Sequence, residues 1–212
     1  MAKKSEKPSE LRQRRADGEL SRNRILDAAS EIAAERGYEG TTIGAVSVKC
    51  GLPNSSIYWH FKDKDDLIAA VIERSFGTWL GAWRLPDGGD LQDGLVEIAG
   101  QTAKALLESP DFIRLGLMLA LERRPVEPRA RTMFLAVRDQ ALTEIVSNIR
   151  LYSPGLTDAQ CRQLATYAMA GADGLFIAKE IGGDSVDLLA MLEVHAQAVY
   201  DTAVRMLAET QR

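Results

Sequence analysis

The feature that most constrains the fold of this chain is a series of long segments with apolar residues at helical spacing, each closed by proline or glycine. Five such segments follow residue 89, and we predict helices there at about 90–109, 111–123, 127–151, 157–181 and 186–209. Ala and Leu dominate these segments, while aromatic residues make up only 6% of the chain. No stretch alternates as a strand would. The chain is therefore predicted to be all-α.

The first third of the chain predicts shorter helices. Apolar residues at Ile25, Ala29 and Ile32 predict a helix over about 21–36, which ends before Gly37. Three further helices are predicted at about 42–49, from residue 53 or 54 to 60, and from about 63 to the turn sequence at 85–89. Residues 1–20 are polar and charged, so we expect a mobile arm there.

Size and composition narrow the class of protein. The 212 residues are 46% hydrophobic, which is enough for a sizeable core in one large or two small domains. No apolar run reaches the length of a membrane span, and the N-terminus lacks the apolar region of a signal peptide. Cys50 and Cys161 show neither metal-site nor disulfide spacing. We expect a cytoplasmic protein without metal, cofactor or membrane contact.

Charge is unevenly distributed along the chain. Residues 1–64 hold 12 Lys and Arg against 9 Asp and Glu, a net charge of +3, whereas the remainder has a net charge of −7. A basic N-terminal part followed by an acidic remainder indicates an anionic partner at one end of the protein. The alternative is ordinary scatter of surface charge.

Residues 51–64 have the pattern of a turn followed by a DNA-reading helix. Gly51 is placed for the tight turn of a helix-turn-helix. Short polar side chains then allow close approach to base edges, and the aromatic, histidine and lysine side chains that follow can contact phosphates and sugars. Including two residues before the turn, the predicted DNA-binding set is Thr42, Lys49, Asn54, Ser55, Ser56, Tyr58, Trp59, His60 and Lys64.

Each of these residues also has a plainer interpretation. Lys49 and Lys64 could be ordinary solvated charges, and His60 could be structural. Phe61 is expected in the core, and Tyr58 is expected to pack its ring while its hydroxyl reaches a phosphate. The basic arm could enter a minor groove or be disordered.

The stretch "GYEGTTIGAVSVKCGLPNSSIYWHFKDKDDLIAAVI" resembles the DNA-binding signature of the tetracycline-repressor (TetR) family of transcriptional regulators. The matching positions are Gly37, Tyr38, Thr41, Thr42, Gly51, Tyr58, His60, Phe61 and Lys64. The sequence departs from the family pattern in three places, namely Val46-Ser47, Cys50 and Pro53. Because proline lacks a capping hydroxyl, the cap of the recognition helix passes to Asn54 or is absent.

The resemblance implies about nine helices in two functional parts after the arm: a helix-turn-helix domain at 21–66 and a ligand-binding and dimerisation domain at 67–212. It implies a homodimer through residues 157–209, and the long small and apolar faces of that region allow close helix packing. It also implies an effector cavity, whose candidate residues are Trp79, Trp83, Phe112, Met118, Phe134, Tyr167, Asp173 and Phe176. Asp173 could instead lie at the dimer interface, and the others could be core residues.

Taken together, these patterns predict a repressor that a small hydrophobic molecule releases from its DNA operator. Two alternatives are a helical interaction protein without DNA binding and a regulator without an effector. An enzyme is not expected, since His60 and His195 are the two histidines and no nucleophile elbow, phosphate-binding loop or metal-ligand cluster occurs.

Overall fold

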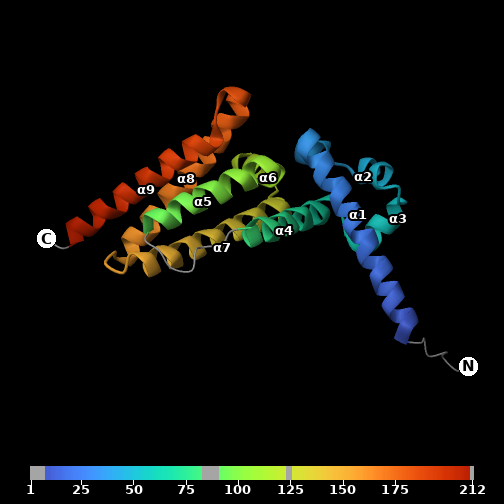
Figure 1. The fold of residues 1–212 in the computed structure, drawn as a ribbon. Helices are drawn as coiled ribbons and strands as arrows, with labels where there is room; N and C mark the ends of the chain where they lie inside the picture. Colours follow the sequence, from blue (N-terminus) through green and yellow to red (C-terminus); the bar gives the residue numbers. More distant parts are fainter. Residues whose placement is uncertain (1–7, 83–90, 123–125, 211–212) are drawn as a thin grey trace, which may run out of the picture. The chain divides into compact units, whose positions relative to one another are not determined.

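The computed structural model describes residues 8–82, 91–122 and 126–210, and within these ranges every long element is an α-helix (Figure 1). The helices are α1 (Pro8–Gly40), α2 (Ile43–Cys50), α3 (Asn54–His60), α4 (Lys64–Ala82), α5 (Leu91–Glu108), α6 (Asp111–Leu121), α7 (Arg129–Tyr152), α8 (Asp158–Gly182) and α9 (Leu188–Thr210). A short 3₁₀ turn, Gly183–Ser185, joins α8 to α9. The all-α prediction is confirmed.

The chain forms two compact units. The first contains the chain up to Ser75 together with Asp111–Phe134, and the second contains Phe76–Pro110 with Leu135–Arg212. Helices α4 and α7 thus each begin in the first unit and end in the second. The predicted functional boundary between residues 66 and 67 stays a prediction.

Helices α1, α2 and α3 and the start of α4 share one apolar core in the first unit. Ile25 and Leu26 of α1 are fully buried against Val46 of α2, Ile57 of α3 and Leu67 of α4. The periodic apolar residues of α1 supply one wall of this core, because residues three and four apart share a helix face. Burial of each large side chain stabilises the unit by roughly 1.5–3 kcal/mol.

The start of α1 differs from the sequence-based prediction. The helix begins at Pro8, not near Ser21. Residues 8–20 lack an apolar stripe, but they are rich in good helix formers, and proline is favourable in a first helical turn. Residues 8–20 are therefore helical where an arm was expected, and residues 1–7 lie outside the described residues. Near its end, α1 is kinked at Gly37, whose φ of 66° favours glycine.

In the second unit, α9 packs against both α5 and α8 (Figure 1). Buried side chains from α7, α8 and α9 form its core: Val146, Ile149, Cys161, Leu164, Ala165, Val199 and Ala203. Helix α8 starts with a capping box between Thr157 and Gln160. Within the described ranges, no helix has the length and apolarity that crossing a membrane requires.

Candidate nucleic-acid interface

The turn between α2 and α3 is fixed by local geometry and by two side chains. Gly51 adopts the left-handed conformation with φ 65° and ψ 25°. The guanidinium of Arg24 donates to the carbonyl oxygen of Cys50 at 2.7 Å, and the hydroxyl of Ser47 donates to the carbonyl oxygen of Leu52 at 2.6 Å. These contacts anchor the turn to α1 and hold α3 at a set angle to α2.

The two short helices begin differently. Thr42 caps α2, since its hydroxyl oxygen accepts from the amide of Ala45 at 3.1 Å. Pro53 precedes α3 and gives it no side-chain cap. Of the two expectations for the recognition helix, a cap that passes to Asn54 or no cap, the second is confirmed. The carbonyl oxygen of Pro53 accepts from the amide of Ser56 at 2.9 Å.

Helix α3 has one buried and one exposed face. Ile57 is fully buried, and Phe61 just after the helix is also buried, as predicted. Asn54 and Ser55 are exposed, and Ser56 is half-buried. Because 55% of Tyr58 is exposed, the expectation that its ring is packed is wrong.

Trp59 extends the exposed face of α3 toward α1. Its side chain is 76% exposed, and one edge of its indole lies beside Gly18. Together with Tyr58 it gives α3 an exposed face of short polar residues followed by aromatic ones. A helix of this kind fits the major groove of DNA, with its polar start toward base edges.

His60 is held at the end of α3 by α1. Its Nε2 lies 2.8 Å from the hydroxyl of Ser21, and its ring packs edge-on against Trp59. Burial lowers the pKa of His60, and the nearby Arg22 guanidinium lowers it further. The neutral imidazole is thus favoured near pH 7. No local pattern in the sequence pointed to Ser21, because it is 39 residues away from His60.

Both predicted lysines lie on the first unit and pair with glutamates of α1. The ammonium of Lys49 is 2.6 Å from Glu31, and that hydrogen bond raises the pKa of Lys49. The ammonium of Lys64 lies 3.3 Å from Glu39 and 4.2 Å from the centre of the Tyr38 ring. A phosphate would therefore compete with a carboxylate for each cation.

The candidate effector residues are spread over both units. In the first unit, the buried rings of Phe112 and Phe134 lie 5.8 Å apart, while Met118 is half exposed. In the second unit, the ring of Tyr167 is 5.4 Å from that of His195.

The remaining effector candidates also belong to the second unit or fall outside the described residues. Trp79 is half-buried, with its ring 6.3 Å from that of Phe76. Phe176 is buried, and Asp173 forms a two-pronged ion pair with Arg138. Burial raises the pKa of Asp173 although Arg138 opposes that shift. Trp83 lies outside the described residues.

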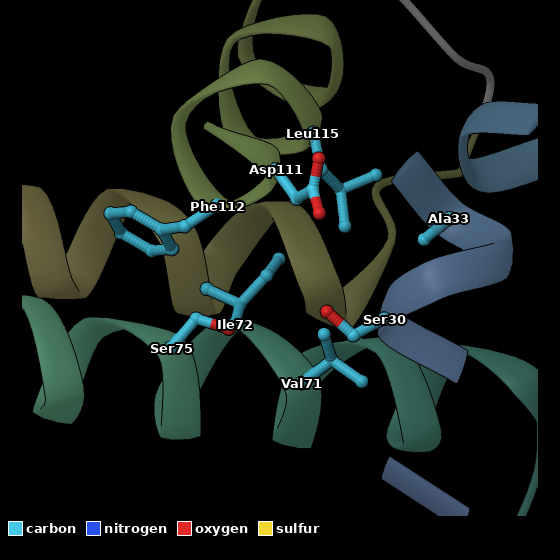
Figure 2. Close-up of a pocket in the computed structure, with 8 residues that line it drawn as sticks. All are labelled: Ser30, Ala33, Val71, Ile72, Ser75, Asp111, Phe112 and Leu115. Carbon is cyan, nitrogen blue, oxygen red and sulfur yellow. The ribbon is translucent and has the colours of Figure 1, made fainter. Parts of the chain in front are cut away.

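One pocket of the first unit contains a predicted effector residue. Figure 2 shows its lining by α1, α4 and α6, namely Ser30, Ala33, Val71, Ile72, Ser75, Asp111, Phe112 and Leu115. Its volume is about 10 Å³, close to the minimum for a single water molecule. Phe112 is the predicted effector residue among them. Sites for drug-sized ligands are typically about 300–1,000 Å³, so this pocket is too small for one.

The described residues contain no group of three or more His, Cys, Asp and Glu side chains placed to hold a metal ion.

Comparisons with known proteins found a matching family model and similar sequences. Residues 25–71 match the family model described as "Bacterial regulatory proteins, tetR family". An HTH-type transcriptional repressor from Mycobacterium tuberculosis is 25% identical over 136 residues, which are 64% of this chain and 51% of the relative. The chain thus spans about half the length of that curated relative.

Solved structures share the fold across nearly the whole chain. The fatty acid degradation regulator FadR from Bacillus halodurans has a TM-score of 0.72 at 16% identity, over 92% of this chain and 96% of the other. The regulator FadR from Bacillus subtilis, solved in complex with stearoyl-CoA, has a TM-score of 0.67 at 18% identity, over 83% and 96% of the two chains. At these identities, the likeness establishes a common fold.

Proposed function

Because residues 25–71 match the model of the tetR family of bacterial regulatory proteins, we propose that the chain is a TetR-type, ligand-responsive transcriptional repressor. It binds an operator as duplex DNA through α2 and α3, and a small hydrophobic molecule releases it. The DNA-binding part corresponds to residues 21–66 and the effector-binding and dimerisation part to 67–212. Its place of action is the cytoplasm, where bacterial DNA lies.

The observation that carries this proposal is the exposed face of α3. Its polar residues begin directly after a turn that Gly51 and Arg24 hold in place. Side chains at the start of such a helix read bases, while flanking hydroxyl and amino groups bind phosphates. We therefore assign base contacts to Asn54, Ser55 and Ser56. Phosphate and sugar contacts are assigned to the rest of the predicted set: Thr42, Lys49, Tyr58, Trp59, His60 and Lys64.

A gel-shift titration with a duplex of the DNA immediately upstream of the coding sequence tests DNA binding. We expect binding that weakens steeply as salt rises, because phosphate contacts release counterions. Failure to bind that duplex at low salt would favour the helical interaction protein among the alternatives.

We further propose a two-fold dimer through residues 157–209. Several large apolar side chains on α8 and α9 are exposed in the single chain, at Tyr167, Ile177, Ile181, Leu189, Met191, Val194 and Val204. Exposed apolar surface on this scale is typical of an interface. Light scattering should therefore give twice the chain mass of 23.2 kDa. A strict monomer at micromolar concentration would rule out this assembly.

The effector proposal rests on α4 and on a solved relative. FadR from Bacillus subtilis was crystallised with stearoyl-CoA, which has a long apolar chain. Helix α4 begins with Lys64 at the proposed DNA contact and carries Trp79 near its other end. A molecule that favours a different tilt of α4 would lower DNA affinity by its preference for that state. We propose an apolar compound such as an acyl chain or an aromatic drug.

Tryptophan fluorescence during a compound screen, combined with the gel shift, tests this release. Compounds that quench Trp79 should also displace the upstream duplex. Compounds that bind and quench but leave DNA affinity unchanged would contradict coupling through α4 and favour a regulator without an effector.

A further inference from the structure

Asp65, in the first turn of α4, joins three helices of the first unit. One carboxylate oxygen, Oδ1, accepts from the hydroxyl of Tyr38 and from the amide of Ala130, each at 3.1 Å. The other oxygen, Oδ2, accepts from the amide of Arg129 at 2.5 Å. Tyr38 belongs to the end of α1, and Arg129 is the first residue of α7. A single half-buried carboxylate therefore connects α1, α4 and α7.

Asp66 strengthens the same junction. Its carboxylate forms an ion pair with the guanidinium of Arg129 and accepts from the amide of Lys62 at 3.1 Å. Its own amide donates to the carboxylate of Asp63 at 2.8 Å. The segment that leads from α3 into α4 is thus anchored to the first turn of α7.

Helix electrostatics explain why a carboxylate occupies this position. The first amides of α7 have no acceptor within their own helix, and they carry the positive end of its dipole. Asp65 supplies both a negative charge and two acceptor positions. Hydrogen bonds to an ionised group are stronger than those between neutral groups. The carboxylate of Asp65 therefore binds the first turn of α7 more strongly than a neutral acceptor would.

The junction also reaches a proposed DNA contact. Tyr38 is 92% buried, and its ring supports the ammonium of Lys64 at 4.2 Å. The same ammonium lies 3.3 Å from the carbonyl oxygen of Tyr38. The hydroxyl bond to Asp65 fixes the orientation of the Tyr38 ring, and with it the place of Lys64.

We propose that Asp65 is a positioning residue for DNA binding. It holds Lys64 in place through Tyr38 and transmits the state of the DNA-binding helices to the first turn of α7. This inference rests on the proposed function. It adds a coupling through α7 to the coupling between effector and DNA proposed for α4. Beyond Phe134, α7 continues into the second unit.

Asp65→Asn in the full chain tests the proposal, with Asp27→Asn as the matched control. Asp27 also links α1 to α4, through an ion pair with Arg74 at 2.8 Å. This ion pair involves neither Tyr38 nor α7. Tyr38→Phe is the second variant, since it removes the hydroxyl and keeps the ring under Lys64. If Asp65→Asn does not fold, Tyr38→Phe tests the proposal in its place.

Two measurements are made with the upstream duplex: its affinity and the amide exchange of a peptide covering residues 129–134. We expect Asp65→Asn to weaken binding about tenfold, within the usual range of coupling between sites, and Tyr38→Phe to weaken it less. Asp27→Asn should bind as the parent does. DNA should slow exchange at Arg129 and Ala130 in the parent, and this slowing should be lost in Asp65→Asn.

The outcomes separate this inference from the proposed function. A parent chain that does not bind the duplex refutes the proposed function, and the role of Asp65 with it. If the parent binds but a folded Asp65→Asn chain binds equally well, Asp65 has no positioning role. If DNA leaves exchange at residues 129–134 of the parent unchanged, the transmission to α7 is refuted.

Discussion

Gly116→Ala should lower the free energy of unfolding by about 1–2 kcal/mol, through a clash between α6 and α7. A methyl group at Gly116 would overlap the ring of Phe134, which is 98% buried and cannot swing into solvent. Overpacking of a core costs about 1–3 kcal/mol. The higher helix propensity of alanine stabilises the variant by at most about 1 kcal/mol, so the clash dominates.

Thermal unfolding followed by circular dichroism measures this effect, with Gly100→Ala as the matched control. Gly100 is also a helical glycine, but apart from its chain neighbours and the nearby backbone of its own helix, no described atom lies within 4 Å of an added methyl group there. The control should therefore be neutral or slightly stabilising. In a Phe134→Leu background the penalty at Gly116 should shrink, because the two sites are in contact. An equal loss of stability in both glycine variants would exclude the clash.

Asn54→Ala should weaken binding to the upstream duplex by about 5- to 150-fold, the equivalent of one lost base contact worth about 1–3 kcal/mol. Asn54 is the first residue of α3, where side chains of a recognition helix meet base edges. Its side chain is exposed and its substitution leaves the core of the first unit intact. The Asn54→Ala chain should therefore discriminate less between the upstream duplex and other DNA sequences.

A duplex of scrambled sequence and equal length provides the control. Asn54→Ala should bind this duplex as the parent does, because phosphate contacts do not read sequence. Lys64→Ala should weaken binding to both duplexes alike and lower the slope of log affinity against log salt by about one. If Asn54→Ala lost the same factor on both duplexes, its assignment to base reading would be wrong.

The sequence by itself determined the helical elements and the turn at Gly51. The prolines and glycines between the periodic segments end the helices, and apolar residues at helical spacing have to face a core, so α2 to α9 lie within a few residues of the predicted ranges. The start of α1 was missed because residues 8–20 carry helix propensity without an apolar stripe. The exposed positions of Asn54 and Ser55 follow from the same local rules.

Only the tertiary structure decided how those elements are held together. It paired Lys49 with Glu31, placed Ser21 against His60, and brought Asp65 to the first turn of α7. These partners are between 18 and 65 residues apart, and no periodicity encodes which polar side chains meet across such distances. It also distributed the predicted effector residues between two units, because residues that share an aromatic character along a sequence need not share a core.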